Sequence, residues 1–377
     1  MTASTPYKIE HPFKVAIIGS GNWGTAVAKL VAENCAEKPE IFQKEVPMWV
    51  YEEEIENDKG QKRKLTEIIN NDHENVKYLP GIQLPTNLVA NPDIVDIVKD
   101  ADLLVFNIPH QFLPRINKQL KGNVKPTARA ISCLKGLEVD SEGCKLLSTS
   151  VTDDLGIYCG VLSGANIATE VAKGNWSETS VAYTVPKDFR GEGKDIDEYV
   201  LKQVFHRPYF HVRVIQDVVG ASIAGALKNV VACAVGFVVG AGWGDNAKAA
   251  IMRIGIKEII HFASYWQKFG IKGLAPPDPS TFTEESAGVA DLITTCSGGR
   301  NVKVAKYMVE HKVDAWEAEK TVLNGQSSQG IITSKEVHEL LEAYKLQNEF
   351  PLFEATYKII YENGKVEDLP ALLEGEE

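Results

Sequence analysis

The amino-acid sequence predicts an α/β domain built on a doubly wound, mostly parallel sheet, followed by an all-α domain. Short apolar, β-branched runs alternate with amphipathic segments over residues 13–215, the first run enters a glycine-rich turn, and strand patterns vanish from about Asp217. Strands that alternate with helices form parallel sheets covered by helices on both faces. A length of 377 residues suits two domains, which we place at residues 1–215 and 216–377.

The predicted strands are short runs rich in β-branched and apolar residues, at Lys14–Ile18, Val46–Tyr51, Leu103–Ile108, Arg129–Leu134, Cys159–Leu162, Ser180–Thr184 and Phe210–Val214. Helix-like stretches separate several of them, at Thr25–Glu33, Leu65–Asn70, Phe112–Gln119 and Ile167–Ala172. Residues 185–198 are charged and contain glycine, which is typical of a surface excursion. Helical patterns in the second domain cover Gly220–Gly240, Ala247–Phe269, Val302–Glu310, Asp314–Leu323 and Ser334–Tyr344.

The turn after the first predicted strand has the pattern Gly-x-Gly-x-x-Gly, at Gly19, Gly21 and Gly24. A strand, this turn and a helix together form the context of a dinucleotide-binding fingerprint. Gly19 would permit the tight turn, Gly21 would let the backbone approach a pyrophosphate, and Gly24 would let helix and strand pack closely. The helix N-terminus would offer N–H groups to the phosphates. An ordinary glycine turn is the alternative interpretation.

Acidic residues follow the second predicted strand, where a carboxylate would accept a hydrogen bond from a ribose 2′-hydroxyl and repel a 2′-phosphate. Glu52 and Glu53 occupy this position, and no arginine accompanies them. This favours NAD over NADP. The alternative is that the run of three glutamates, which ends at Glu54, is a solvated turn.

Composition narrows the classes of partner. A net charge of −11 argues against nucleic acid or an anionic membrane as the main partner, so an anionic substrate would need a local basic site. Six scattered cysteines fit reduced thiols in an intracellular protein, and neither they nor the eight histidines have metal-ligand spacing. The first thirteen residues lack the apolar run of a signal peptide. The apolar stretch Gly220–Gly242 contains Lys228 and Asn229, which favours a buried helix over a membrane span.

Lys228 stands among small apolar residues, and a helix would place Ala224, Leu227 and Val231 beside it. Desolvation lowers the pKa of a lysine and makes it usable as a general acid or base near neutral pH. The pattern equally allows a lysine that extends its ammonium group to water from a helix edge. Asp291 is a second charge among apolar neighbours, either a partner for such a lysine or a helix N-cap.

A possible anion site precedes the helix predicted from Val302. Two glycines at 298 and 299 are followed by Arg300 and Asn301, which would combine a forked guanidinium with backbone N–H groups. The alternative is a glycine loop with a surface arginine.

Several motifs together resemble NAD-dependent glycerol-3-phosphate dehydrogenase, most closely the soluble eukaryotic enzymes of the fungal branch. They run in the family's order over about residues 13–360, at residues 18–24, Asn75–Gly81, Ile108–Phe112, Gly164–Ala168, Gly225–Val230, Ala290–Thr295 and Gly299–Asn301. The resemblance implies an N-terminal Rossmann-like domain and a helical substrate-binding and catalytic domain. It also implies a cytoplasmic homodimer in glycerol and carbohydrate metabolism that reversibly converts dihydroxyacetone phosphate and NADH into sn-glycerol 3-phosphate and NAD.

The resemblance also implies roles by position. Lys228 would be the general acid and, in reverse, the base, with Lys135 and Asp291 as further catalytic groups. The substrate would contact Lys135, Asn229, Thr295, Arg300 and Asn301. The cofactor would contact Gly19, Ser20, Gly21, Asn22, Trp23, Gly24, Tyr51, Phe112, Lys135, Ala168, Arg300 and Gln329.

The sequence departs from the family at two positions. Tyr51 stands where many members have phenylalanine, and it would still stack on the adenine. Ser327 stands where some members carry lysine, which puts one cofactor contact in doubt. The segment Lys187–Asp195 resembles a branch-specific insertion, and Asn324–Gly330 is a candidate flap. The alternative functions are a related two-domain NAD(P) hydroxyacid dehydrogenase and a non-catalytic NAD(H)-binding sensor, and the set of Lys135, Lys228 and Asp291 argues against the latter.

Overall fold

The computed structural model describes residues 6–56, 60–140, 143–323 and 327–374. The chain forms two compact units, which we describe separately. Unit 1 comprises Met1–Leu134, Ser148–Leu162 and Asn166–Gln216, and unit 2 comprises Lys135–Leu147, Ser163–Ala165 and Asp217–Glu377.

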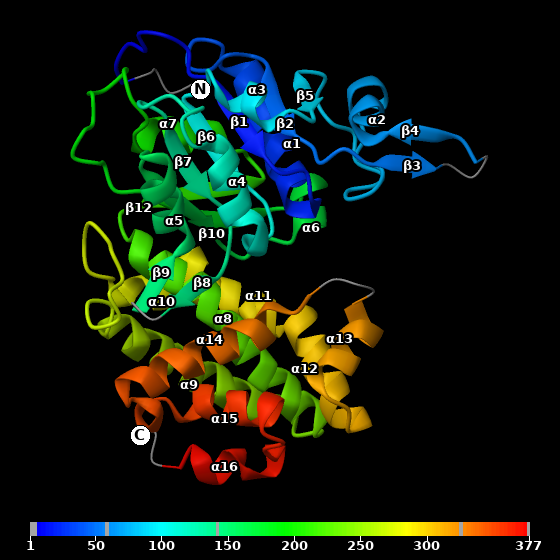
Figure 1. Ribbon diagram of the computed structural model, residues 1–377, viewed down its shortest axis with the longest axis vertical. Helices are drawn as coiled ribbons and strands as arrows, with labels where there is room; N and C mark the ends of the chain where they lie inside the picture. Colours follow the sequence, from blue (N-terminus) through cyan, green and yellow to red (C-terminus); the bar gives the residue numbers. More distant parts are fainter. Residues whose placement is uncertain (1–5, 57–59, 141–142, 324–326, 375–377) are drawn as a thin grey trace. The chain divides into compact units, whose positions relative to one another are not determined.

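Unit 1 contains an eight-stranded, mostly parallel sheet with the order β12-β11-β10-β7-β6-β1-β2-β5 (Figure 1). Its strands are β1 (Val15–Ile18), β2 (Val46–Trp49), β5 (Leu88–Asn91), β6 (Leu103–Phe106), β7 (Arg129–Ser132), β10 (Cys159–Ser163), β11 (Ser177–Ala182) and β12 (Phe210–Ile215). From β1 the chain builds outward to β2 and β5, and then returns to place β6 on the other side of β1. The strand order therefore reverses at β1 and β6, and ligands of such sheets bind at the carboxyl ends of these strands.

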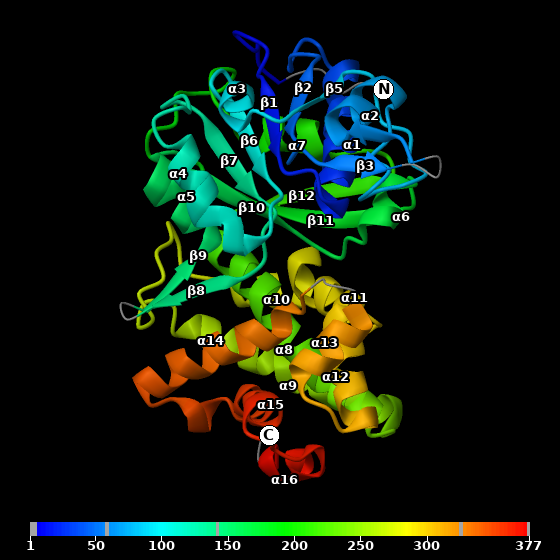
Figure 2. The same ribbon diagram turned by 45° about the vertical axis from the view of Figure 1, so that its right-hand side comes forward.

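Helices cover both faces of this sheet, as the alternating sequence pattern predicts. On one face, α1 (Asn22–Glu37) packs against α6 (Ala168–Ala172) and α7 (Glu198–Phe205). On the other face lie α3 (Ile94–Val98), α4 (Leu113–Leu120) and α5 (Leu147–Leu155), as Figure 2 shows. Unit 1 also contains the short helices η1 (His110–Phe112) and α2 (Leu65–Asp72). The predicted doubly wound architecture is confirmed.

All seven predicted strands form, and the described residues contain five further strands that were not predicted. The edge strand β5 is only four residues long. The antiparallel pair β3 (Glu54–Glu56) and β4 (Lys62–Lys64) consists mainly of exposed charged residues. The pair β8 (Leu137–Asp140) and β9 (Gly143–Leu146) belongs to unit 2. Each of these five strands has only three or four residues, which is too short for a strand pattern to be recognised.

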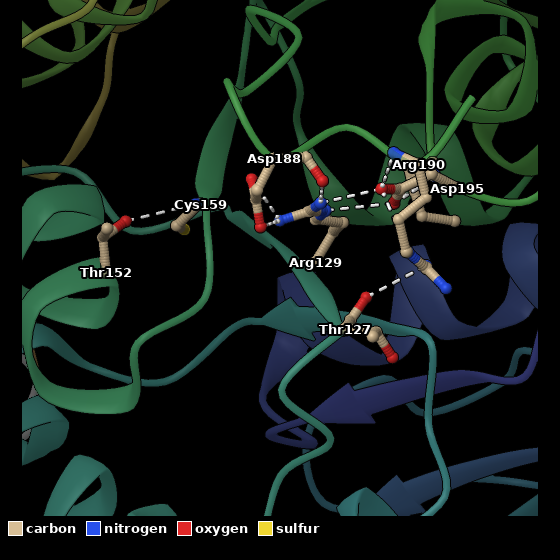
Figure 3. Close-up of polar contacts among 8 residues, drawn as sticks. Thr127, Arg129, Thr152, Cys159, Asp188, Arg190 and Asp195 are labelled. Carbon is tan, nitrogen blue, oxygen red and sulfur yellow. Dashed lines mark hydrogen bonds and ion pairs between the residues drawn. The ribbon is translucent and has the colours of Figure 1, made fainter. Parts of the chain in front are cut away.

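The segment 185–198 is not simply a surface excursion, because a buried ion cluster anchors it to the sheet (Figure 3). Arg129, at the start of β7, is buried and donates from Nε and Nη2 to the Asp195 carboxylate at 3.0 and 2.7 Å. Its Nη1 also pairs with Asp188 at 3.0 Å. Arg190 adds a contact with Asp195 at 3.3 Å. Asp195 is fully buried, and a buried charge is retained only when it is paired in this way.

From Asp217 onward, the described part of the chain is helical, as predicted. Its helices are α8 (Val218–Gly240), α9 (Gly244–Ser264), α10 (Pro279–Glu284), η2 (Ser286–Ala290), α11 (Asp291–Cys296), α12 (Arg300–His311), α13 (Ala315–Leu323), α14 (Gln329–Tyr344), η3 (Gln347–Glu349), α15 (Pro351–Tyr361), η4 (Val366–Asp368) and α16 (Leu369–Leu372). Among these, η2 is a π-type turn.

Helix α8 forms the core of unit 2 and packs against α9, α11, α12, α14 and α15 (Figure 1). It is the one helix of the described chain long and apolar enough to cross a membrane, and 89% of its most apolar window is buried inside the protein. Gly236 allows α12 to approach, because a Cβ there would lie 2.5 Å from the Cβ of Ala305. The prediction of a buried helix is confirmed. All six cysteines are buried, and none forms a disulfide.

Candidate functional site

The glycine turn that joins β1 to α1 lies where the strand order of the sheet reverses. Gly19 has a φ of +109°, and a Cβ on it would lie 2.6 Å from the carbonyl oxygen of Asn107 after β6. A Cβ on Gly24 would lie 2.4 Å from the carbonyl oxygen of Gly19. Gly21 precedes the first residue of α1 and has open space where a side chain would stand. The turn therefore leaves an open backbone surface at a helix N-terminus, which fits a dinucleotide phosphate.

A buried asparagine that sequence reasoning gave no role holds this turn in place. Asn75 donates from Nδ2 to the carbonyl oxygen of Ser20 and to Thr25 Oγ1, both at 2.9 Å. Thr25 Oγ1 in turn donates to the Ser20 carbonyl at 3.0 Å. Asn22 is fixed by a 2.7 Å bond from its Nδ2 to the carbonyl oxygen of Tyr78. The only sequence signal for these contacts is the motif Asn75–Gly81.

The other cofactor residues predicted within unit 1 fall into two groups. Tyr51 and Phe112 are 67% and 48% exposed, and so leave aromatic surface available for stacking. Trp23 and the buried Ala168 instead pack α1 against α6, with the Trp23 ring 6.3 Å from that of Phe210.

Glu52 and Glu53 are both engaged within the protein. Thr66 Oγ1 donates to Glu52 Oε2 at 2.7 Å, and the Tyr78 hydroxyl donates to Glu53 Oε1 at 2.7 Å. Lys77 forms an ion pair with the other oxygen of Glu53. A solvated turn is therefore the wrong interpretation for these two side chains.

A buried charge cluster in unit 2 joins three residues that lie far apart in the sequence. Lys228 on α8 donates from Nζ to Asp291 Oδ1 and, at 2.7 Å, to Thr295 Oγ1. Lys135 donates from Nζ to Asp291 Oδ2 at 2.6 Å and lies 3.5 Å from the carbonyl oxygen of Gly164. One carboxylate thus lies between two ammonium groups, and the three side chains carry a net charge of +1 when all are ionised.

Burial sets the electrostatics of this cluster. Lys228 is 6% exposed, and desolvation lowers its pKa to about 7, with Lys135 adding to the decrease and Asp291 opposing it. Burial opposes ionisation of Asp291, but the two lysines overcome it, so the net pKa of this carboxyl lies below its usual value. The alternative interpretation, in which Lys228 extends its ammonium group to water from a helix edge, is therefore wrong. A small cavity beside it is lined by Ala224, Ile256, Ile259, Phe282, Gly288 and Leu292.

Local structure positions the carboxylate. Asp291 is the first residue of α11 and follows the π-type turn η2, whereas Ala290 occupies the N-cap position. The N-cap interpretation of Asp291 is therefore wrong. Gly288 inside the turn must be small, because a Cβ there would lie 2.3 Å from the carbonyl oxygen of Thr281. This close approach sets the direction in which α11 starts and thereby places Asp291 opposite α8.

Of the other predicted residues of unit 2, Asn229 lies within α8 and Thr295 within α11, whereas the last three lie at helix starts. Arg300 is the exposed first residue of α12, and Gly298 before it has a φ of +141°. Asn301 is buried and donates from Nδ2 to Asn229 Oδ1 at 2.8 Å. Gln329 begins α14, with its Nε2 3.5 Å from Ser327 Oγ. Residues 324–326 of the candidate flap lie outside the described residues.

The sheet with a glycine turn at its reversal point, together with the buried lysine–aspartate centre, defines the class of two-domain dehydrogenases that bind a dinucleotide. The family pattern of the NAD-dependent glycerol-3-phosphate dehydrogenase N-terminus matches residues 14–188, and that of the C-terminus matches residues 217–371. The chain belongs to the NAD-dependent glycerol-3-phosphate dehydrogenase family and is an NAD-dependent oxidoreductase.

Individual proteins support this assignment. The chain is 79% identical over 377 residues to glycerol-3-phosphate dehydrogenase (NAD(+)) 2 of Candida albicans, covering 100% of both chains. A solved glycerol-3-phosphate dehydrogenase of Saccharomyces cerevisiae is 63% identical, with a TM-score of 0.89 over 96% of this chain and 99% of that one. The structure from Plasmodium falciparum is 35% identical, with a TM-score of 0.85 over 98% and 99%. The resemblance inferred from the motifs, including the fungal branch, is confirmed.

Proposed function

We propose that the chain interconverts dihydroxyacetone phosphate and sn-glycerol 3-phosphate, and that Lys228 is the general acid and base. The cluster of Lys228, Asp291 and Lys135 carries the proposal, because it combines a lysine of lowered pKa with a fixed counter-charge. NAD supplies the hydride chemistry when it is bound. Reduction of the ketone builds negative charge on its oxygen, which ammonium groups in a dry site stabilise. Lys228 then gives its proton to that oxygen, and the neutral amine accepts a proton in the reverse direction.

Each partner of Lys228 has a distinct role in this proposal. Asp291 keeps the lysine in position and favours its charged form. Lys135, whose side chain is 29% exposed, holds the other oxygen of Asp291 and polarises the substrate. Thr295 accepts a hydrogen bond from Lys228 and so limits the directions in which its ammonium group donates.

The phosphate of the substrate would bind at the start of α12. Arg300 supplies a guanidinium, and the first turn of the helix supplies backbone N–H groups. Asn301 and Asn229 lie beside them and complete the substrate contacts. A local cationic site of this kind holds an anionic substrate despite the net charge of −11.

We assign the NAD-binding domain to residues 1–215 and the substrate-binding and catalytic domain to 216–377, with Lys135 of the first segment added to the catalytic groups and two residues of the second segment added to the cofactor contacts. The proposed cofactor contacts are the turn Gly19–Gly24, the exposed rings of Tyr51 and Phe112, and Lys135, Ala168, Arg300 and Gln329. We further propose a homodimer in the cytoplasm, as the family resemblance implies.

The decisive experiment follows NADH oxidation in the presence of dihydroxyacetone phosphate, with NADPH and unphosphorylated dihydroxyacetone as controls. We expect turnover that requires both NADH and the phosphate group. Turnover of a keto acid in place of the phosphorylated ketone would favour the alternative function, a related two-domain hydroxyacid dehydrogenase. NADH binding without any turnover would indicate a sensor.

Replacing Arg300 by alanine should chiefly raise the KM for dihydroxyacetone phosphate, by about 10- to 100-fold, because the change removes a charge-assisted contact to the phosphate. Steady-state kinetics at saturating NADH measures this effect. Unphosphorylated dihydroxyacetone is the control substrate. It has no phosphate for Arg300 to contact, so its already low kcat/KM should not fall further in the variant. An unchanged KM for the phosphorylated ketone would contradict the assigned phosphate contact.

The pH dependence of the two reaction directions should be opposite. Ketone reduction needs protonated Lys228, so its kcat/KM should fall as pH rises through the lysine pKa of about 7, whereas alcohol oxidation should increase over the same range. Lys135 lowers the pKa of Lys228, so Lys135→Gln should move both limbs to higher pH. Profiles of kcat/KM between pH 5.5 and 9.5 would measure this shift, because the range extends on the order of two pH units to each side of the Lys228 pKa. A shift toward lower pH would contradict the assignment.

A further inference from the structure

The side chain of Asn301 accepts two hydrogen bonds from the segment that begins α14. Ser328 Oγ donates to Asn301 Oδ1 at 2.7 Å, and the backbone N–H of Gly330 donates to the same oxygen at 3.0 Å. Ser328 is fully buried and Asn301 nearly so. Because a backbone N–H can only donate, the Gly330 contact identifies which end of the Asn301 amide is the oxygen, and the shorter Ser328 contact adds to the stability of that orientation.

This orientation is passed on to Asn229. With its oxygen facing Ser328 and Gly330, Asn301 donates from Nδ2 to Asn229 Oδ1 at 2.8 Å. The oxygen end of the Asn229 amide is therefore occupied by a donor. Within the described residues, its nitrogen end makes one long contact, of 3.4 Å with the carbonyl oxygen of Gly225 one helical turn earlier. Asn229 directly follows Lys228, the proposed general acid, in the sequence.

We propose that Ser328 is a positioning residue that acts through Asn301 to hold the Asn229 amide with its N–H groups available to the substrate. This inference rests on the proposed function of the site. In the proposed site, the N–H groups of Asn229 would add to the donors of Lys228 and Lys135, which suits a substrate rich in carbonyl and phosphate oxygens. A reversed Asn229 amide would set its own oxygen against those oxygens and would weaken substrate binding.

Other contacts hold the backbone of this segment, so the Ser328 hydroxyl can be removed without displacing it. The backbone N–H of Ser328 donates to Glu319 Oε2 on α13 at 2.7 Å. Gly330 lies so close to α8 that a Cβ there would be 2.4 Å from the carbonyl oxygen of Asn229. Replacing Ser328 by alanine therefore removes one of the two donors that orient Asn301 and leaves the backbone in place.

The test compares Ser328→Ala, at the N-cap of α14, with the control Ser334→Ala within that helix. Ser334 is also buried, and its hydroxyl donates to the carbonyl oxygen of Ile331 at 2.8 Å. We expect Ser328→Ala to raise the KM for dihydroxyacetone phosphate about three- to tenfold, with kcat within about twofold of wild type. The KM for NADH should not change. Ser334→Ala should leave all three constants unchanged.

A double-variant cycle distinguishes positioning from a general loss of structure. If Ser328 acts through Asn229, then Ser328→Ala should alter the KM for dihydroxyacetone phosphate by less than about 1.5-fold in an Asn229→Ala background. An unchanged KM in the single variant, an equal rise in the KM for NADH, or an undiminished effect in the Asn229→Ala background would overturn the inference alone. Wild-type enzyme that does not oxidise NADH with dihydroxyacetone phosphate would refute the proposed function instead.

Discussion

Replacing Lys228 by alanine is expected to lower kcat by about 10²- to 10⁴-fold in both reaction directions, the usual contribution of a positioned general acid or base. The change removes the ammonium group that would protonate the ketone oxygen. It leaves Asp291 paired with Lys135 at 2.6 Å, so the buried carboxylate keeps one counter-charge and the fold should survive. NADH binding, measured by fluorescence titration, should be retained because the glycine turn belongs to unit 1.

Lys228→Arg is the matched control for this prediction. Arginine restores the positive charge beside Asp291, but it does not release a proton in the working pH range. If proton transfer is the role of Lys228, the arginine variant should remain about as slow as the alanine variant. Recovery of kcat with arginine would show that a positive charge alone is sufficient. Near-normal turnover of Lys228→Ala would refute a role of Lys228 in catalysis.

The sequence could predict the sheet and the helical domain because both are encoded locally. The run Val15–Ile18 and the glycines after it lie within ten residues of one another, and their spacing alone identifies a strand, a tight turn and a helix start. Lys228 could be singled out for the same reason, since its apolar neighbours are neighbours in sequence. The pattern left open whether its ammonium group reached water, because that depends on helices packed against α8.

The residues that sequence reasoning missed act through contacts between distant segments. Asn75 holds a turn that begins 56 positions earlier, and Arg129 anchors Asp195 from β7. Ser328 donates to Asn301, which the sequence pattern does single out, from 27 positions away. Their residue types are common in loops and at helix ends. Only the folded structure therefore distinguishes a buried polar side chain that joins two segments from a polar side chain exposed to solvent.

Replacing Asp291 by asparagine should impair both stability and proton transfer, because it leaves two ammonium groups without their shared carboxylate. Breaking a buried ion pair costs about 3–5 kcal/mol of unfolding free energy. The loss should be greater at low pH, where protonated Lys228 of the wild type gains from Asp291 and the variant offers no counter-charge, and should decrease as rising pH removes the proton from wild-type Lys228. Denaturant unfolding of the variant and of wild type at about pH 6 and about pH 9 measures how this loss of unfolding free energy depends on pH. The two pH values lie on the order of one to two units to either side of the Lys228 pKa.

The same substitution should change the pH profile of catalysis. Asp291 raises the pKa of Lys228, so its removal lowers that pKa further and leaves the lysine mostly neutral at neutral pH. Ketone reduction near neutrality should then fall by about 10²-fold or more and should partly recover at lower pH, where Lys228 regains its proton. Glu258→Gln is the control, since Glu258 is a buried carboxylate of the same unit that accepts the backbone N–H groups of Leu352 and Phe353. It should lose stability and keep its kcat and pH profile, so a similar profile in both variants would show that Asp291 acts through stability alone.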